Sequence, residues 1–372
     1  SILSFEAALT GVQCHFLVAE PIVTKRGQTI SKPGETLTNQ LIAKLTFYKI
    51  DAVTVEETEP EPEVAPEPAP VPEKKESHIS DQITYTQRLK ASPKFQKFQS
   101  DYALNIAYLK ENFEAIIAGG GAECSDLMLE NCESLFKSKT TLELFDMLSN
   151  MRNLEDPIYS HSLNVALIAR SIGKWLQFSR EDLNILTLAG LLHDIGKTQI
   201  PESILNKPGR YTDEEFETMK SHPLLGKKIL NNKRFDSRIL AATLQHHERS
   251  DGSGYPRGLM EDEIDDFASI IAIADVYDAM TSARVYRGPL CPFQVISIFE
   301  QEGLQKYDPE YILVFLGYVV NTYMNNRVRL SNGMEGDIVL INKMDLSKPM
   351  VKCGNHYIDL SHEHGVFIEA II

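Results

Sequence analysis

Seven histidine and aspartate side chains between positions 161 and 275 are of the types that bind divalent metal ions. They are His161, His193, Asp194, His222, His246, His247 and Asp275. One octahedral ion accepts about six donors and would then leave no place for water or substrate. Seven donors therefore favour two neighbouring ions, which an aspartate can bridge with its two oxygens. Imidazole with carboxylate suits iron, manganese, zinc or nickel, and the lack of nearby thiolates argues against a structural zinc finger.

Helical patterns are predicted around these donors. His161 begins an apolar stripe at helical spacing, and the pair His193–Asp194 ends another helix. Asp275 lies in an apolar helix interior, where an ionised carboxylate is costly unless it is paired or bound to a metal. The pair His246–His247 closes a further helix, and adjacent residues of a helix point about 100° apart. We therefore expect His246 and His247 to serve two ions rather than one.

Phosphodiester hydrolysis is the chemistry that such a centre predicts. A metal pair can lower the pKa of a bridging water toward neutrality and hold a phosphoryl oxygen, so no side-chain nucleophile is required. Lys197 follows Asp194 by three residues and is predicted to hold a phosphate oxygen in the same mouth. Arg284 and Arg287 follow the predicted helix of Asp275. They are candidates for a second phosphate and a guanine face, because guanidinium binds phosphate in a bidentate manner and also stacks.

Two strings of residues resemble HD-GYP domains, a subgroup of the HD phosphohydrolases. They are HDIGK at 193–197 and HHERSDGSGYP at 246–256, and the likeness extends over residues 151–328. The resemblance implies an all-helical bundle that hydrolyses the bacterial second messenger cyclic di-GMP to linear pGpG, often followed by GMP. It also implies that Asp194 and Lys197 are catalytic and that Lys197, Arg284 and Arg287 bind phosphate.

The loop Gly254-Tyr255-Pro256 has two interpretations. Its glycine and proline residues make a turn in any case. The resemblance implies that the loop lines the substrate mouth and docks GGDEF-domain proteins, the synthases of the same nucleotide. Tyr255 is predicted to stack on a base or to pack internally, and Asp251 to organise the loop at the substrate.

The resemblance also bears on the number of metal ions. Some HD-GYP domains hold three, with an additional glutamate four residues before the first histidine. In this chain that position is Pro157, which offers no donor atom. Glu155 and Asp156 come before this proline, which disfavours helical geometry in the preceding residue. We therefore predict two divalent ions bridged by Asp194, with iron as the first choice and manganese as the second.

Composition limits the partners of this 372-residue chain. Its formal net charge of −15 argues against binding of a nucleic-acid polymer. Five scattered cysteines without a CxxC pair favour reduced thiols. No run of about 18 apolar residues predicts a membrane span, and no secretory signal is visible. We expect a cytoplasmic protein.

Five segments are predicted, and together they give a mainly α fold. Residues 1–57 are expected to be a small α/β regulatory or interaction unit, with a helix over 41–48. Residues 58–76 are a Glu/Pro-rich linker, because eight glutamates and six prolines fall within 56–76. Helical lead-in 77–150 is predicted to pack on the next domain or to form a homodimer. An HD-type helical bundle (151–328) and a small β appendage (329–372) complete the chain.

Two other functions compete with hydrolysis of cyclic di-GMP. One is a scaffold that binds a cyclic dinucleotide and a partner without turnover. Such a domain is expected to have lost a metal ligand, and this chain retains all seven candidates. The other is hydrolysis of a hybrid cyclic dinucleotide, which the residues do not distinguish from cyclic di-GMP.

Overall fold

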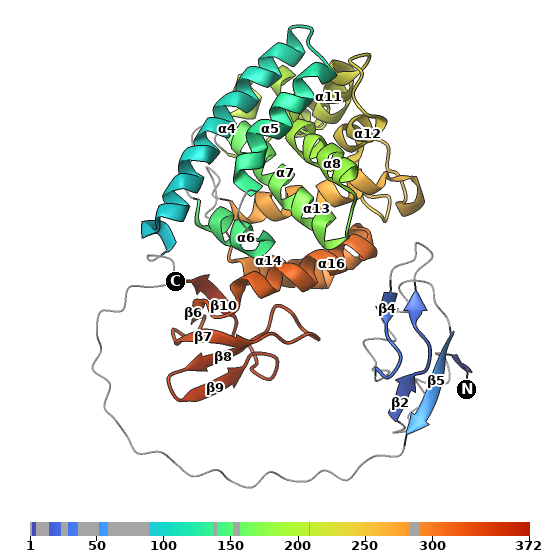
Figure 1. Cartoon of the computed structure of the whole chain (residues 1–372), viewed down its shortest axis with the longest axis vertical. Helices are drawn as coiled ribbons and strands as arrows, with labels where there is room; N and C mark the ends of the chain where they lie inside the picture. The colour runs from blue at the N-terminus through green and yellow to red at the C-terminus, as the bar shows by residue number, and fades with distance from the viewer. Residues whose placement is uncertain are drawn as a thin grey trace. The chain divides into compact units, whose positions relative to one another are not determined.

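The computed structural model describes residues 2–4, 15–23, 29–35, 52–58, 89–136, 140–151, 157–207, 209–282 and 290–372. The chain divides into two compact units, Ser1–Gln82 and Ile83–Ile372. The second unit contains a body of helices followed by a small sheet near the C-terminus (Figure 1).

Short strands make up the described part of the first unit. Strands β1 (Ile2–Ser4), β5 (Ala52–Thr58) and β2 (His15–Val18) form an antiparallel sheet in the order β1-β5-β2. Strand β3 (Ile22–Val23) pairs with β4 (Thr29–Ser31). Strands are therefore present in the predicted α/β unit, whereas the helix predicted over 41–48 lies outside the described residues.

Three helices precede α7 (Pro157–Trp175), the helix that carries His161. Helix α4 (Pro93–Ile117) starts at Ser92, whose side chain accepts a hydrogen bond from the backbone N–H of Phe95. A short 3-10 turn, η1 (Ala122–Cys124), leads into α5 (Ser125–Phe136), and α6 is Thr141–Asn150. The predicted helical lead-in therefore contains several separate helices, and the Thr140–Glu143 capping box begins the last of them.

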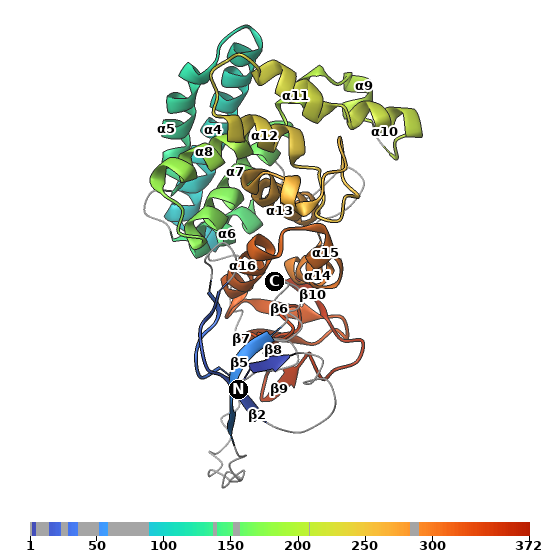
Figure 2. The same ribbon diagram turned by 90° about the vertical axis from the view of Figure 1, so that its right-hand side faces the viewer.

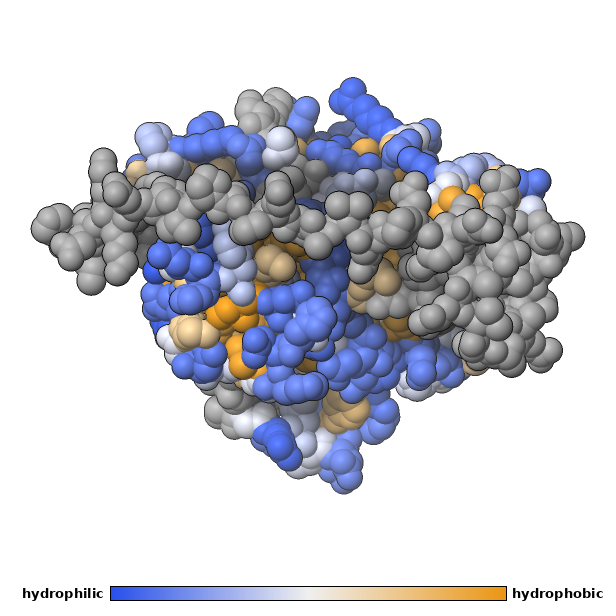
Figure 3. Space-filling view, turned by 90° about the horizontal axis from the view of Figure 1, so that it is seen from below, coloured by the Kyte–Doolittle hydropathy of each residue, from blue (hydrophilic) through white to orange (hydrophobic). Residues whose placement is uncertain are grey.

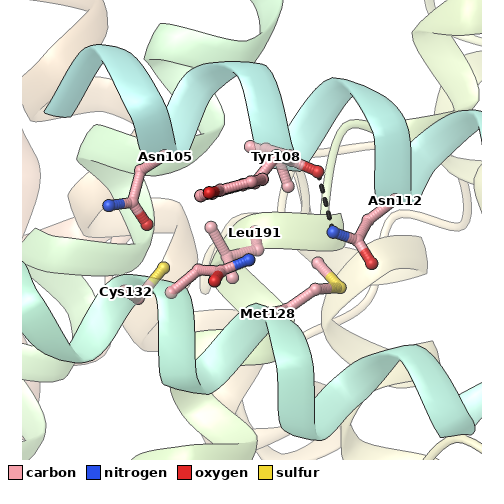
Figure 4. A pocket seen from close by; sticks show the side chains of 8 residues that line it. Asn105, Tyr108, Asn112, Met128, Cys132 and Leu191 are labelled. Carbon is pink, nitrogen blue, oxygen red and sulfur yellow. Dashed lines mark hydrogen bonds between the residues drawn. The ribbon is translucent and has the colours of Figure 1, made fainter. Parts of the chain in front are cut away.

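Helix α4 packs on α5, and residues of both helices together with Leu191 of α8 line a small cavity (Figure 4). The cavity has a volume of about 10 Å³, which is room for about one water molecule. Asn105 and Asn112 of α4 lie beside it, and each donates its side-chain amide to a carbonyl of the preceding turn. The cavity is therefore a packing feature and is too small for a ligand.

Fourteen further helical segments follow in the described part of the bundle. They include α7 (Pro157–Trp175), α8 (Arg180–Leu192), η2 (Ile195–Gln199), α9 (Glu202–Leu205), α10 (Asp213–Met219), α11 (His222–Leu230), α12 (Ser237–Gln245), η3 (Glu261–Glu263), α13 (Asp266–Thr281), α14 (Pro292–Ile298), α15 (Leu304–Lys306) and α16 (Pro309–Val319). A π-helical turn, Phe299–Gly303, joins α14 to α15, and η5 (Val320–Tyr323) follows α16. Helix α13 is apolar on nearly all sides and is buried against α7, α8 and α12, whereas α9 and α10 extend away from the body (Figure 2).

A five-stranded antiparallel sheet ends the chain. Its order is β10-β6-β7-β8-β9, with β6 (Arg327–Leu330), β7 (Glu335–Leu340), β8 (Met350–Cys353), β9 (His356–Asp359) and β10 (Ile368–Ile371). Glu300 joins the sheet region to the helices, because its carboxylate accepts backbone N–H groups of Leu346 and Ser347. The predicted mainly α fold with a C-terminal β appendage is confirmed.

The surface seen from below is largely hydrophilic, with apolar residues in separate patches (Figure 3). Among the described helices, none combines the length and the apolar composition that crossing a membrane requires.

Candidate metal centre and active site

The structure brings all seven predicted metal-binding side chains together inside the second unit. His161 is in α7, His193 and Asp194 follow α8, His222 begins α11, His246 and His247 follow α12, and Asp275 is in α13. Donor atoms lie within 4.8 Å of one another in three sets, which are His161/His193/Asp275, His193/Asp194/His246 and His222/His246/His247. Because the sets share members, the seven side chains form one continuous cluster.

Asp194 lies between two pairs of histidines. Its Oδ2 is 3.6 Å from Nε2 of His161 and 3.4 Å from Nε2 of His193. Its Oδ1 is 3.2 Å from Nε2 of His222 and 3.7 Å from Nε2 of His246. Each carboxylate oxygen thus faces its own pair of imidazole nitrogens, which is the arrangement that a carboxylate shared by two cations needs.

Asp275 also contacts the cluster with both oxygens. Its Oδ1 is 3.0 Å from Nε2 of His161, and its Oδ2 is 3.7 Å from Nδ1 of His247. His246 and His247 both belong to the set that includes His222, which favours one ion for the pair over the two ions that the sequence predicts. Helix α12 ends at Gln245, so His247 does not follow the helical step on which that expectation rested.

The ring orientation of four histidines is fixed by hydrogen bonds from Nδ1. The acceptors are Asp278 Oδ2 for His161 (2.7 Å), Gly190 O for His193 (2.7 Å), Met219 O for His222 (2.7 Å) and Thr243 O for His246 (3.0 Å). Three of these acceptors are carbonyls in the last turn of a helix, where backbone oxygens lack helical partners. When Nδ1 carries the hydrogen, Nε2 keeps its lone pair for a metal ion.

Electrostatics keep the carboxylates charged and two of the imidazoles neutral. Burial raises the pKa of Asp194, but the charge of Lys197 and the contacts with His193 outweigh it and hold that pKa well below its usual range. Burial likewise opposes ionisation of Asp275, and the hydrogen bond from His161 overcomes it and lowers the pKa. Burial lowers the pKa of His246 strongly and that of His247 to about 3. These side chains therefore offer lone pairs and negative charge at neutral pH.

The cluster fits a divalent metal centre. Nε2 of His193 and Oδ1 of Asp194 are buried and have no hydrogen-bond partner within the described part of the chain. Buried polar atoms without partners are uncommon and costly. Burial lowers the pKa of His161, but hydrogen bonds with Asp275 and Asp278 outweigh it and raise that pKa to about 9. A positive charge is thus favoured at this place, and imidazole with carboxylate is a donor set for divalent metals.

Gly196 explains how η2 and α11 come close enough to join the cluster. A Cβ at this position would lie 1.9 Å from the carbonyl oxygen of His222 and 2.5 Å from the backbone nitrogen of Gly226. Only glycine therefore allows this approach.

Lys197, the next residue, places Nζ 2.5 Å from Oδ2 of Asp194. Lys197 thus reaches the mouth of the centre, as the spacing predicts.

Glu248 anchors the loop that follows the histidine pair. It is buried, and its two oxygens accept the backbone N–H groups of Arg257 (2.7 Å) and Leu259 (3.0 Å). Gly254 lies against the backbone of Glu248, where a Cβ would come within 2.4 Å. The conformation of the loop is thus set by these backbone contacts.

Tyr255 and Asp251 have different surroundings in this loop. The Tyr255 ring stacks on the ring of His247, with centroids 4.7 Å apart, and its backbone N–H donates to the carbonyl of His247. Asp251 is exposed, and its Oδ1 accepts hydrogen bonds from the backbone N–H and the hydroxyl of Ser253. Tyr255 therefore borders the metal cluster, and Asp251 shapes the turn.

Two predicted substrate residues, Arg284 and Arg287, lie outside the described residues, as do Glu155 and Asp156.

Asp278 is a functional residue that sequence reasoning missed. It is buried beside His161, and the available signal was its position three residues after Asp275, on the same side of a helix. Glu248 was also missed, although it lies within the motif itself.

Comparisons with known proteins identify the segment that carries the cluster. Residues 130–311 match the HD domain family, a metal-dependent phosphohydrolase domain, and all seven cluster residues lie within that segment.

Three proteins named as cyclic dinucleotide phosphodiesterases are similar to the chain in sequence. A cyclic di-GMP phosphodiesterase of Thermotoga maritima is 41% identical over 47% of this chain and 48% of its own length. One of Pseudomonas aeruginosa is 34% identical over 62% of this chain and 55% of its own. A 3'3'-cGAMP-specific phosphodiesterase of Vibrio cholerae is 38% identical over 43% of this chain and 38% of its own. The chain thus spans about half the length of the first two relatives.

Proposed function

Since residues 130–311 are an HD domain of the HD-GYP type, we propose that the protein hydrolyses cyclic di-GMP to linear pGpG in a metal-dependent reaction. The position of Asp194, with each oxygen facing two imidazole nitrogens, supports this proposal most strongly. Relatives named cyclic di-GMP phosphodiesterases also support it.

The proposed centre holds two divalent ions. His161, His193 and Asp275 would serve one of them, His222, His246 and His247 the other, and Asp194 both. Imidazole and carboxylate donors suit iron first, with manganese as the alternative. When bound, the ions supply Lewis acidity and lower the pKa of a coordinated water.

The protein's own residues then orient and hold the substrate. Lys197 carries a positive charge next to Asp194 and is proposed to hold a non-bridging phosphate oxygen, whose negative charge it favours. Tyr255 covers the ring of His247 and offers an aromatic face to a base. Arg284 and Arg287 remain proposals from the sequence for the second phosphate and a guanine, and Asp251 for organising the loop at the substrate.

A time course of products tests the proposed reaction. The full chain, loaded anaerobically with Fe²⁺ or Mn²⁺, should convert cyclic di-GMP to pGpG. Asp194→Asn should remain folded and lose turnover, because it replaces one carboxylate oxygen by an amide nitrogen that cannot bind a cation. Binding of cyclic di-GMP without product under either metal would refute the proposal and favour a scaffold.

A hybrid dinucleotide is the second candidate substrate. Relatives named 3'3'-cGAMP-specific phosphodiesterases are 34–38% identical to this chain in the matched segments. Both dinucleotides offered together at equal concentration give the ratio of kcat/KM directly. We expect cyclic di-GMP to be consumed first, and faster loss of 3'3'-cGAMP would reverse the assignment.

The loop and the segments outside the bundle are proposed to bind partners. Arg257 and Met260 are exposed next to Gly254–Pro256, where a GGDEF-domain protein is proposed to dock. Met260→Asp should weaken binding of a purified GGDEF-domain protein in calorimetry without changing turnover. Residues 1–57 are proposed as the regulatory unit. The chain is also proposed to form a homodimer, and light scattering of the full chain tests this proposal.

A further inference from the structure

Tyr102 is a fully buried tyrosine on α4, outside the segment that matches the HD domain family. Its hydroxyl lies 2.5 Å from Oδ1 of Asn164 and 3.1 Å from the carbonyl oxygen of Ser160, both on α7. Burial, and then the charge of Asp278, raises the pKa of Tyr102 well above its usual value. The hydroxyl therefore keeps its proton and acts as a donor toward α7.

The orientation of the Asn164 amide follows from its neighbours. Its Nδ2 lies 2.8 Å from Oδ1 of Asp278, and a carboxylate can only accept hydrogen bonds. The amide nitrogen must therefore point to Asp278, which leaves Oδ1 to accept the hydroxyl of Tyr102. A flipped amide would place two acceptors against each other at the Asp278 contact.

Asp278 connects the Asn164 amide to the metal cluster through hydrogen bonds. It is buried, its Oδ1 also accepts the hydroxyl of Ser282, and its Oδ2 lies 2.7 Å from Nδ1 of His161. With a hydrogen on Nδ1, the opposite nitrogen of His161 faces Asp275 and Asp194. One series of hydrogen bonds thus runs from α4 through α7 and α13 to His161.

We propose that Tyr102 is a positioning residue, which fixes the ring of His161 for metal binding through Asn164 and Asp278. This inference rests on the proposed function for the role of His161 as a metal ligand. It makes α4 a part of the catalytic unit, and it provides a physical route by which a displacement of α4 changes metal affinity.

Metal affinity of the full chain tests the proposal. Hydrogen-bond partners behind a metal ligand are worth about 10–100-fold in affinity, and Tyr102 acts one residue further away. We expect Tyr102→Phe to weaken Mn²⁺ binding about 3–10-fold for one ion, measured by competition with a chelating dye. Tyr108→Phe, on the same helix and 42% exposed, is the matched control and should bind like wild type.

A double variant separates positioning from simple packing. Asn164→Ala breaks the series, so adding Tyr102→Phe to it should cost no further affinity. Additive losses would overturn the proposal, and so would a Tyr102→Phe variant that changes only the urea midpoint of the metal-free protein. The readout does not depend on turnover: a wild type that binds Mn²⁺ but leaves cyclic di-GMP intact would refute the proposed function alone. A wild type that binds neither Mn²⁺ nor Fe²⁺ would refute both.

Discussion

An alanine at position 196 should displace α11 and remove one half of the metal centre. The added Cβ would meet the carbonyl oxygen of His222 at 1.9 Å, so the two backbones must separate by about 1.5 Å to reach an ordinary contact of 3.4 Å. Both neighbours are backbone atoms, and no side-chain rotation relieves the clash. His222 would then leave Oδ1 of Asp194, which is 3.2 Å from its Nε2.

The size of the effect follows from this displacement. Overpacking costs about 1–3 kcal/mol, which corresponds to a fall in Tm of roughly 2–12 °C for a unit of this size. Bound metal should fall from about two ions per chain to about one, measured on the sample used for calorimetry. Gly317→Ala is the control, because its Cβ would meet nothing within 4 Å. A Gly196→Ala variant with wild-type Tm and metal content would refute the reasoning.

Three further predictions address charge and the loop. Lys197→Ala should raise KM or lower kcat while metal content stays near that of wild type, and loss of metal would contradict its assignment to the substrate. Glu248→Gln replaces one carboxylate oxygen by an amide nitrogen, so one backbone N–H of the loop loses its charged acceptor. This loss should cost about 1–3 kcal/mol in urea unfolding, and an unchanged midpoint would contradict the anchoring role. Hydrogen bonds from Ser179 and Arg238 lower the pKa of Asp182, and those from Arg238 lower the pKa of Asp236, below the ordinary 3.8. The stabilisation from Arg238 is therefore complete at neutral pH and is lost as the pH falls through the lowered values. The difference in stability between wild type and Arg238→Gln should therefore be constant from about pH 7 to 5 and shrink below about pH 4, and a difference that grows on acidification would be inconsistent with this.

The sequence predicts the parts of the structure that depend on residue type and spacing. The seven cluster residues were recognisable because histidine and aspartate in apolar helices are costly without a metal or a partner. Helix α4 was recognisable from apolar residues at three- and four-residue steps, and it ends before Gly119, whose φ is +122°. Both signals are local, so no knowledge of the tertiary fold was needed.

Other features depend on contacts between distant residues. Tyr102 and Asn164 are 62 positions apart, and no pattern in the sequence joins them. The direction of His247 depends on where α12 ends, which sequence patterns locate less reliably than the helix itself. The register of the C-terminal sheet shifts between β10 and β6 and between β7 and β8, and alternation of residues does not specify such bulges.

The number of ions bound per chain decides whether Asp194 joins two metals. The full chain should be loaded anaerobically with excess Fe²⁺ or Mn²⁺, freed of unbound metal and analysed for its elements. We predict two ions per chain for wild type, and one or none for Asp194→Asn. One ion per wild-type chain, or three with the third at Glu155 or Asp156, would contradict the two-metal centre.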